Sequence, residues 1–421
     1  MRRVFLTGAT GVMGMAGLGE LTREAGRYAV TVLARPGKRN ETKLAPFVAK
    51  GVKVIWGDLL DPESIRRGVA EADVVLHVGG MVSPAADWHP EQTLKVNVGA
   101  MRLIAGAVKA REEADPALKL KTVYIGSVSQ YGDRLPPDHT GGVGDRLIPS
   151  KFDAYALSKI EAERVLVEAG LRRWVSLRQT GILHPGLLFK ADDPIAFHVP
   201  LRGVLEWVTD LDSGRLLERV CRDEVPESFW NDFYNIGGGE SYRMTNRDFE
   251  ARLLAALGCP PPERAFRKEW FALRNFHGIW YTDSDRLEEL LHFRSGETAE
   301  ECFKRMAASL PWYFRLAPLA PAFAIRAFMG TVAAKRGLGP LWWKKHPGES
   351  FLGIPNEARV EAAFGADSSL RPGDAEIGLP LRSLGDDEWQ CAAGHRFRAT
   401  PLLIERGGHV CPECLHRWSS K

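Results

Sequence analysis

The feature that most constrains this chain is a glycine-rich turn near its N-terminus, between a short apolar run at 4–6 and a helix-like segment. Its three glycines stand at positions 8, 11 and 14. Glycine lets the backbone turn tightly and lets a pyrophosphate approach the main chain, while the free N–H groups at the start of a helix attract the anion. The GxxGxxG spacing differs from the GxGxxG of the general dinucleotide fingerprint, so a purely structural turn is the alternative. The residues that we expect to contact a dinucleotide here are Gly8, Thr10, Gly11, Val12, Met13 and Gly14.

A second β-rich run at 29–34 is followed by the cations Arg35, Lys38 and Arg39. In NAD-binding units an acidic residue near this point binds the ribose 2′-OH, whereas a basic residue accommodates a 2′-phosphate. Because Ala34 stands at this point and Arg35 follows it, we predict NADP(H) as the cofactor, with NAD(H) as the second choice. The alternative is that the three cations form a solvated loop.

Two more strands are expected at 52–58 and 73–80, with a helix between them from Pro62 to about Ala70. Small residues where a strand ends leave room for a cofactor. Strands that alternate with helices predict parallel pairing with right-handed crossovers, so the first 180 residues should form an α/β fold with a doubly wound parallel Rossmann sheet. At the ends of these two strands we place four more cofactor contacts, Asp58, Leu59, Val78 and Gly79.

A fifth strand, at 122–127, ends in Ser127, and a later helix-like segment carries Tyr155 and Lys159 four residues apart. That spacing puts both side chains on one helix face, where an ammonium group favours the ionised form of a phenol. A phenol with a pKa of about 10 needs such help to act as an acid or base near neutral pH. Each residue alone also fits an ordinary role, a surface pair on an amphipathic helix and a strand-end cap.

An ordered set of motifs runs through the first part of the chain: 7–14, Asp58, Asn97, Ser127 with Tyr131-Gly132, Tyr155 with Lys159, and Arg178 with His184-Pro185-Gly186. This set resembles the extended short-chain dehydrogenase/reductases, the NAD-dependent epimerase/dehydratase superfamily, over residues 1 to about 310. The resemblance implies a Rossmann core with a smaller α+β substrate lobe, mainly from 180–310, and homodimers by analogy.

The resemblance also implies roles for individual residues. Tyr155 would be the general acid/base, Lys159 would hold the nicotinamide ribose and lower the pKa of Tyr155, and Ser127 would hydrogen-bond the reacting oxygen. Asn97 would support the site, and Asp58 would contact the adenine end of the cofactor.

Two departures from the family pattern narrow the range of reactions that the chain is expected to catalyse. Nucleotide-sugar dehydratases carry an Asp-Glu pair after the hydroxyl residue, where this chain has Val128 and Ser129. Many sugar-nucleotide epimerases grip a diphosphate with an Asn, where this chain has Gly181. These differences favour an oxidoreductase that interconverts a hydroxyl and a carbonyl, with a nucleotide-sugar epimerase as the alternative. The apolar and aromatic residues after Pro185 suggest an apolar or ring-containing small-molecule substrate, although core packing is the ordinary explanation for most of them.

The segment 311–345 is predicted to be apolar and helical. Pro318 and Pro321, with two arginines, argue against an uninterrupted membrane-spanning helix. Trp342 and Trp343, followed by lysines, suit a lipid headgroup boundary, so a shallow membrane contact through 310–345 is one hypothesis. A helix that packs on the reductase or covers its substrate mouth is the other. Residues 346–385 are predicted to be a mostly irregular linker.

The last segment, 386–421, carries a second motif, made of Cys391 and His395 followed by Cys411 and Cys414. Three thiolates and one imidazole suit tetrahedral Zn²⁺, and the segment resembles a zinc ribbon. Four protein ligands leave no open position, so the metal should be structural. The nearby His409 and His416 are alternatives to His395.

The composition excludes few functions. A net charge of +3 over 421 residues gives no general case for nucleic-acid binding. The cysteine usage and the absence of a secretory signal before the first strand predict a cytoplasmic location, with attachment at the membrane periphery as the alternative. A rival function is a cofactor-sensing scaffold whose zinc segment docks on proteins or nucleic acid. The intact set of Ser127, Tyr155 and Lys159 favours an enzyme, because a sensor needs no acid/base.

Overall fold

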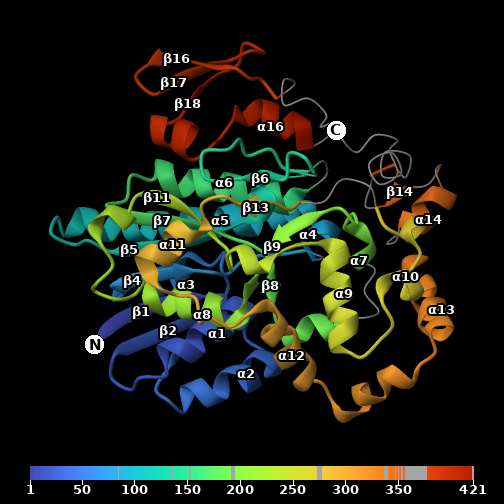
Figure 1. The fold of residues 1–421 in the computed structure, drawn as a ribbon. Helices are drawn as coiled ribbons and strands as arrows, with labels where there is room; N and C mark the ends of the chain where they lie inside the picture. The colour runs from blue at the N-terminus through green and yellow to red at the C-terminus, as the bar shows by residue number, and fades with distance from the viewer. Residues whose placement is uncertain are drawn as a thin grey trace.

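A computed structural model describes residues 1–83, 85–132, 134, 136–150, 153–190, 195–272, 277–335, 340–346, 348, 350–351, 354–355 and 377–419. Its centre is a seven-stranded parallel sheet with the strand order β11-β7-β5-β4-β1-β2-β3 (Figure 1). The strands are β1 (Arg2–Thr7), β2 (Tyr28–Ala34), β3 (Lys53–Trp56), β4 (Val74–His77), β5 (Lys121–Ser127), β7 (Arg173–Gln179) and β11 (Asp232–Ile236). The predicted doubly wound α/β fold is thereby confirmed.

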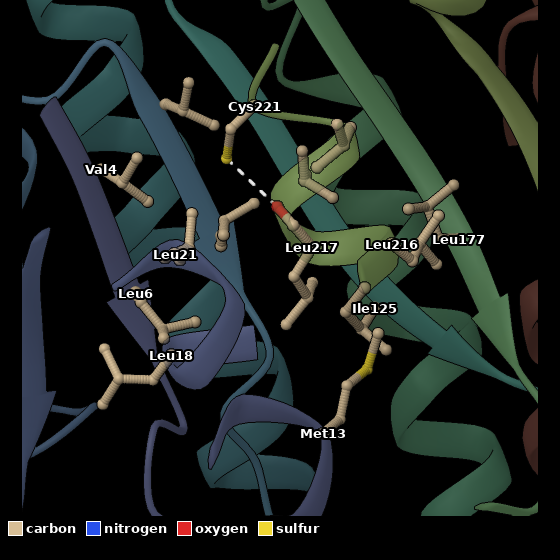
Figure 2. Packing of buried hydrophobic residues seen from close by; sticks show 14 of the residues in the cluster. Val4, Leu6, Met13, Leu18, Leu21, Ile125, Leu177, Leu216, Leu217 and Cys221 are labelled. Atoms are coloured by element: carbon tan, nitrogen blue, oxygen red, sulfur yellow. Dashed lines mark hydrogen bonds between the residues drawn. The ribbon is translucent and has the colours of Figure 1, made fainter. Parts of the chain in front are cut away.

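The two faces of the sheet bury alternate residues of each strand, as the period of two in a strand requires. On β1, Val4 and Leu6 face one core, and Phe5 faces the other. The first core is closed by α1 (Val12–Leu21), α8 (Asp210–Arg219) and α11 (Ser284–Leu291), and Figure 2 shows Leu18 and Leu217 packed between helices and sheet. The second core is closed by α3 (Pro62–Ala70), α5 (Pro90–Ala114) and α6 (Ala154–Glu168). Two further helices of this half are α2 (Lys38–Val48) and the short α4 (Ala85–Trp88).

Local sequence explains where several of these elements begin. Helix α3 starts at the predicted place because the Asp61 carboxylate accepts hydrogen bonds from the backbone N–H groups of Glu63 and Ser64, and Pro62 occupies the first helical position. Helix α9 (Asn246–Ala256) starts after Thr245, which forms a reciprocal capping box with Asp248.

The smaller lobe is built from short strands and helices that mostly follow β7 in the chain, together with β6 (Thr140–Gly141), which precedes α6 and pairs with β13 (Trp280–Tyr281). Its other strands are β8 (Ile182–Leu183), β9 (Val204–Glu206), β10 (Val208–Thr209) and β12 (Arg243–Thr245). Its helices are α7 (Ile195–His198), α9, α10 (Pro262–Ala265) and α12 (Ala299–Ala308). The later apolar segment forms a 3₁₀ helix, η6 (Trp312–Leu319), followed by α13 (Ala322–Ala333) and α14 (Pro340–Lys345).

Within the described residues no single helix has the length and apolarity needed to cross a bilayer, although η6 and α13 together reach that composition while bent by 113° at the break between them.

The C-terminal module is a small antiparallel sheet with helical turns. Its strands are β16 (Leu381–Gly385), β17 (Glu388–Cys391) and β18 (Arg396–Arg398), followed by the turn η8 (Leu402–Arg406) and by α16 (Pro412–Ser419). The predicted linker boundary at residue 385 is therefore wrong, because β16 pairs with β17 and Ile377 is already buried against the module's cysteines. Most of the rest of the predicted linker lies outside the described residues.

The module packs directly on the Rossmann half, above α6 and the β7–β11 edge of the sheet (Figure 1). Trp389, Leu403 and Ile404 belong to the same buried cluster as residues of α6, Trp174 of β7 and Phe233 of β11. The covering layer that α3, α5 and α6 begin is thus completed by the last 45 residues of the chain.

Candidate active site and metal cluster

The glycine turn joins β1 to α1 at the carboxyl end of the sheet. Gly8 has φ +76°, and a Cβ at this position would lie 2.6 Å from the backbone nitrogen of Gly79, which follows β4. A Cβ at Gly14 would lie 2.2 Å from the Gly8 carbonyl oxygen. Only glycine permits these contacts, which bring β1, β4 and α1 together. The N-cap residue Gly11 supplies no side-chain acceptor, so backbone N–H groups of the first turn of α1 are left for an anion.

The other turn residues lie in different environments. Val12 is exposed, Thr10 is half-buried, and the Met13 side chain is buried in the core between sheet and helices (Figure 2). Met13 is thus placed to offer an anion its backbone and not its side chain. Sequence reasoning missed Lys43 of α2, whose ammonium group donates a hydrogen bond to the Thr10 carbonyl oxygen at 2.8 Å and brings a cation to the turn.

The ends of β2, β3 and β4 carry the remaining cofactor candidates. Arg35 is exposed directly after β2. Asp58 is also exposed, and its carboxylate accepts a hydrogen bond from the Leu60 backbone at 2.9 Å. Leu59 packs next to Gly79, where it would be 3.3 Å from an added Cβ. Val78 is partly buried against the first core. Because parallel strands end at one edge, these residues and the glycine turn share the carboxyl edge of the sheet, the edge at which doubly wound folds form their ligand crevice.

Ser127, Tyr155 and Lys159 converge beside that crevice. Ser127 is the last residue of β5 and caps the following turn η1 (Val128–Tyr131). Helix α6 begins after Asp153, whose carboxylate accepts a hydrogen bond from the Ala156 backbone at 2.8 Å, and this start places Tyr155 in the first turn. The Ser127 hydroxyl lies close enough to the Tyr155 hydroxyl to act on its pKa, in the direction that lowers it. The Lys159 ammonium group lies 5.9 Å from the centre of the Tyr155 ring.

Burial dominates the electrostatics of this group. It raises the pKa of Tyr155 to about 12, against the opposite effect of the nearby Ser127 hydroxyl. It lowers the pKa of Lys159 to about 8. The Lys159 ammonium group donates to the Ile125 carbonyl oxygen at 2.8 Å, so the expected lowering of the Tyr155 pKa by this lysine is absent from this arrangement. Tyr155 is consequently a protonated phenol at neutral pH, ready to donate.

Asn97 of α5 fastens two segments of the site to each other. Its amide oxygen accepts from the Met81 backbone N–H at 2.8 Å, and its amide nitrogen donates to the Met81 carbonyl oxygen at 3.0 Å and to Ser158 Oγ at 2.8 Å. Met81 lies after β4, and Ser158 lies beside Lys159 on α6. The amide oxygen and both amide hydrogens of Asn97 are engaged in these contacts, so Asn97 is suited to a positioning role.

Sequence reasoning missed a fully buried ion pair. Glu163 of α6 and Arg178 of β7 are both fully buried and paired at 2.7 Å. Glu163 also bonds His409 Nε2 at 2.8 Å, and Arg178 donates to the Gly407 carbonyl oxygen at 2.6 Å. A signal was present in the sequence, because Tyr155, Lys159 and Glu163 repeat every four residues on one face of α6.

The four predicted metal ligands form one cluster. Cys391 and Cys414 place their sulfurs 3.8 Å apart, and His395 Nδ1 lies 3.3–3.7 Å from the three sulfurs. A tetrahedral ion bound about 2.3 Å from each sulfur and about 2.0 Å from the nitrogen would set these separations near 3.8 and 3.5 Å. The geometry is thus compatible with a metal. Of the alternative histidines, His409 pairs with Glu163, and His416 lies 3.2 Å from Glu161.

The cluster is joined to the catalytic half by apolar contacts. Cys391, Cys411 and Cys414 share a buried cluster with Val128, next to Ser127, and with Leu157, two residues after Tyr155. The module's backbone also accepts hydrogen bonds from this half, including that from the Leu147 N–H to the Gly408 carbonyl oxygen at 2.9 Å.

The structure also describes the sites where dehydratases and epimerases carry distinctive residues, which in this chain are Val128-Ser129 and Gly181. Ser129 donates its hydroxyl to Ser127 Oγ at 2.9 Å, and Val128 is buried, so no carboxylate stands there. Gly181 is covered by side chains, because an added Cβ would lie 2.7 Å from Leu205 and 2.8 Å from Trp207.

Several aromatic residues expected around the substrate instead fill the core of the smaller lobe. Phe197 is fully buried with its ring centre 5.0 Å from that of Phe271 and 5.9 Å from that of Trp270. Core packing therefore accounts for these three. Phe276 lies outside the described residues.

The fold and the glycine crevice define a dinucleotide-binding protein of the doubly wound class. Residues 4–179, less than half of the chain, match the family model described as the NAD dependent epimerase/dehydratase family. The chain is accordingly an NAD-dependent enzyme of the oxidoreductase and epimerase type.

Two characterised relatives are ketoreductases or oxoacid reductases by name. The chain is 25% identical over 274 residues to the 4-hydroxy-2-methyl-3-oxo-4-farnesyl-3,4-dihydroquinoline-1-oxide ketoreductase of Stigmatella aurantiaca, covering 61% of this chain and 73% of the relative. It is 32% identical over 199 residues to the 2-alkyl-3-oxoalkanoate reductase of Shewanella oneidensis, covering 45% of this chain and 46% of that protein. The match thus spans less than half of the second relative.

Solved structures share the fold. The dTDP-glucose 4,6-dehydratase DesIV of Streptomyces venezuelae, determined with NAD, has a TM-score of 0.56 and 20% identity, covering 74% of this chain and 97% of that chain. The UDP-glucose 4-epimerase of Bifidobacterium longum, in complex with NAD⁺ and UDP, has a TM-score of 0.54 and 17% identity, covering 75% and 99%. At these identities the likeness concerns the fold alone.

Proposed function

We propose that this enzyme is an NADP(H)-dependent reductase of a ketone that carries an apolar chain, with Tyr155 as the proton donor. The observation that carries the proposal is that Ser127 lies within reach of the Tyr155 hydroxyl at the carboxyl edge of the sheet, with Lys159 on the same face of α6 as Tyr155. Support for the substrate class comes from the two relatives, whose names describe reductions of oxo compounds with alkyl or farnesyl substituents.

The chain's own residues would handle the substrate oxygen. When bound, the nicotinamide supplies the hydride that adds to the carbonyl carbon. Tyr155 transfers its phenolic proton to the carbonyl oxygen, which becomes the alcohol, and Ser127 donates a hydrogen bond to the same oxygen. The phenolate left on Tyr155 then recovers a proton from solvent. Lys159 would hold the nicotinamide ribose, and the glycine turn would hold the pyrophosphate.

The reaction type is tested by incubating the full chain with 3-oxo acids and aromatic ketones of increasing alkyl length and NADPH. Loss of the NADPH absorbance with formation of the alcohol is expected. Nucleotide sugars belong in the same screen, because an epimerase would interconvert them with no net change in that absorbance. If the folded protein binds cofactor but turns over neither class, and binds nucleic acid instead, the scaffold function replaces the proposal.

The choice of NADP(H) is proposed to depend on the exposed Arg35, with the cation of Lys43 close by at the turn. Replacing Arg35 by Asp is expected to weaken NADPH binding by about 10- to 100-fold, because a charge-assisted hydrogen bond is lost, and to leave NADH binding equal or tighter. Fluorescence titration with both cofactors measures this change. Lys50→Asp, an equal charge change at an exposed site beyond α2, is the control. Equal weakening for both cofactors, or tighter NADH binding by the unchanged protein, would contradict the assignment.

The Cys₃His cluster is proposed to hold a structural zinc ion through Cys391, His395, Cys411 and Cys414. Protein purified without chelator is expected to contain about one zinc per chain, and Cys411→Ser to lose the metal and unfold at a lower temperature. Metal analysis by plasma spectrometry and a thermal scan measure both. The half-buried Cys259, outside the cluster, provides the control variant Cys259→Ser. Metal-free protein that unfolds at an unchanged temperature would refute a structural zinc.

A further inference from the structure

A long stretch of the chain after α12 contains no acidic residue. Residues 302–348 include no Asp or Glu, although the whole chain has 53 of them among 421 residues. The same stretch holds eight cations, Lys304, Arg305, Arg315, Arg326, Lys335, Arg336, Lys344 and Lys345. This charge pattern is local, because the chain as a whole has a net charge of only +3. The stretch is therefore suited to an anionic partner.

Large apolar side chains point outward from η6 and α13, in the middle of this stretch. Leu319 is 77% exposed, Phe323 76% and Trp312 72%. The complete outward set, which we call the apolar face, is Trp312, Tyr313, Leu316, Leu319, Phe323 and Phe328. An apolar surface of this kind at the rim of a water-soluble fold marks a site of contact with another phase or molecule.

The orientation of the apolar face is fixed by contacts on its inner side. Arg326 donates hydrogen bonds to the backbone carbonyl oxygens of Glu263 and Arg264 at 2.8 and 3.0 Å. Val332 and Ala333 are buried in the same cluster as Trp270 of the smaller lobe. Helix α13 is thus apolar both toward the protein and toward the outside, which is unusual for a helix at a protein–water boundary. In Figure 1 it lies at the outer edge of the molecule, away from the C-terminal module.

From these observations we infer that the apolar face is a membrane-binding surface that lies in the interfacial zone of a bilayer containing anionic lipids. Trp312 and Tyr313 have the amphipathic rings that favour the headgroup level. The excess of cations over acids in the stretch 302–348 attracts anionic headgroups, although Arg305 is paired with Glu297 and Asp210 and Arg326 turns inward. With 12 residues, α13 is about 18 Å long, shorter than the roughly 30 Å of a hydrocarbon core, so it is suited to lie along the surface and not to cross it. The inference does not depend on which reaction the enzyme catalyses.

Co-sedimentation of the full chain with vesicles tests the inference. Binding to phosphatidylcholine vesicles that contain phosphatidylglycerol is expected to be at least about 10-fold tighter than to pure phosphatidylcholine vesicles at low salt. The double variant Leu319→Ser with Phe323→Ser keeps the charge and removes apolar area, so its binding should fall by about 100-fold or more. Both side chains are exposed, so the variant should unfold at an unchanged temperature.

The matched control is Val48→Ser with Leu384→Ser, two exposed apolar residues on α2 and β16, which should bind vesicles as the unchanged protein does. Equal loss in both double variants, or failure of the folded protein to sediment with anionic vesicles, overturns the inference. Sedimentation velocity without lipid provides the remaining outcome. If the unchanged protein is a dimer that Leu319→Ser with Phe323→Ser dissociates, and vesicles are not bound, the apolar face joins two copies of the chain and does not meet a membrane.

Discussion

Replacing Tyr155 by Phe is expected to lower the rate of ketone reduction by about 10²- to 10⁴-fold, the usual contribution of a positioned acid or base, with cofactor binding nearly unchanged. The partly buried phenol lies within reach of the Ser127 hydroxyl, and desolvation raises its pKa to about 12. It is therefore protonated at neutral pH, the form that reduction of a carbonyl requires. Phenylalanine keeps the ring and its packing but has no proton to give.

The pH dependence follows from the same protonation state. Reduction needs the protonated phenol, so its rate should stay level through neutral pH and fall only as pH approaches the raised pKa of Tyr155. Oxidation of the alcohol needs the phenolate, so its rate should increase with pH over the same range. Stopped-flow measurement of NADPH oxidation separates this step from product release. A Tyr155→Phe variant that keeps full activity, or loses its cofactor affinity together with its activity, would contradict the assigned role.

A remote tyrosine provides the control for the loss of a hydroxyl group. Tyr313 is more than half exposed on η6, outside the site, so Tyr313→Phe should reduce the ketone as the unchanged protein does. Ser127→Ala should lie between the two variants, because it removes one hydrogen bond to the reacting oxygen but leaves the proton donor in place.

The sequence predicted those parts of the fold that local patterns determine. The apolar run before Gly8 became β1, and the Asp61-Pro62 start of α3 fell where capping chemistry required it. The four-residue spacing of Tyr155 and Lys159 placed both on one helix face because both lie on one continuous helix, α6. These features depend on neighbours within a few residues, which is why they can be read without a structure.

Features that depend on distant partners could not be predicted in this way. Arg178 entered the sequence analysis only as part of a motif, whereas the structure buries it between Glu163 and the Gly407 backbone, 229 residues away. The predicted start of the C-terminal module was placed too late in the chain. The sequence of β16 has no strong β-strand pattern of its own, and this segment becomes a strand only by pairing with β17. Pairings of this kind are decided by tertiary packing.

Replacing Glu163 by Gln is expected to lower the free energy of unfolding by about 3–5 kcal/mol, the range for breaking one partner of a buried ion pair. The Glu163 carboxylate is fully buried, 2.7 Å from Arg178 Nη2 and 2.8 Å from His409 Nε2. An amide at this position leaves the Arg178 guanidinium charge uncompensated inside the protein. The amide also weakens the hydrogen bond to His409, so the backbone N–H groups of η8, Gly407 and Gly408 should exchange their protons with solvent faster. Urea unfolding and hydrogen exchange measure the two effects.

The pH dependence of this loss has a definite sign. Burial alone would raise the pKa of Glu163, but Arg178 and His409 outweigh it and hold the pKa well below its usual value. A carboxyl group with a depressed pKa contributes stability above its unfolded pKa and loses it as pH falls through the folded value. The difference in stability between the unchanged protein and Glu163→Gln should therefore be full at neutral pH and shrink in acid.

Two further variants separate the buried pair from ordinary surface charge. Glu168 lies on the same helix in an exposed pair with Arg164, so Glu168→Gln should cost no more than about 1 kcal/mol. The double variant Glu163→Gln with Arg178→Met removes both charges and should recover part of the loss, because the penalty in the single variant comes from an unpaired buried cation.

If Glu163→Gln is no more destabilising than Glu168→Gln, or if the double variant loses the full sum of the single losses, the ion pair does not hold the C-terminal module against the catalytic helix. Recovery in the double variant with continued fast exchange around residues 404–410 would instead show that His409, and not Arg178, is the contact through which Glu163 fixes the module.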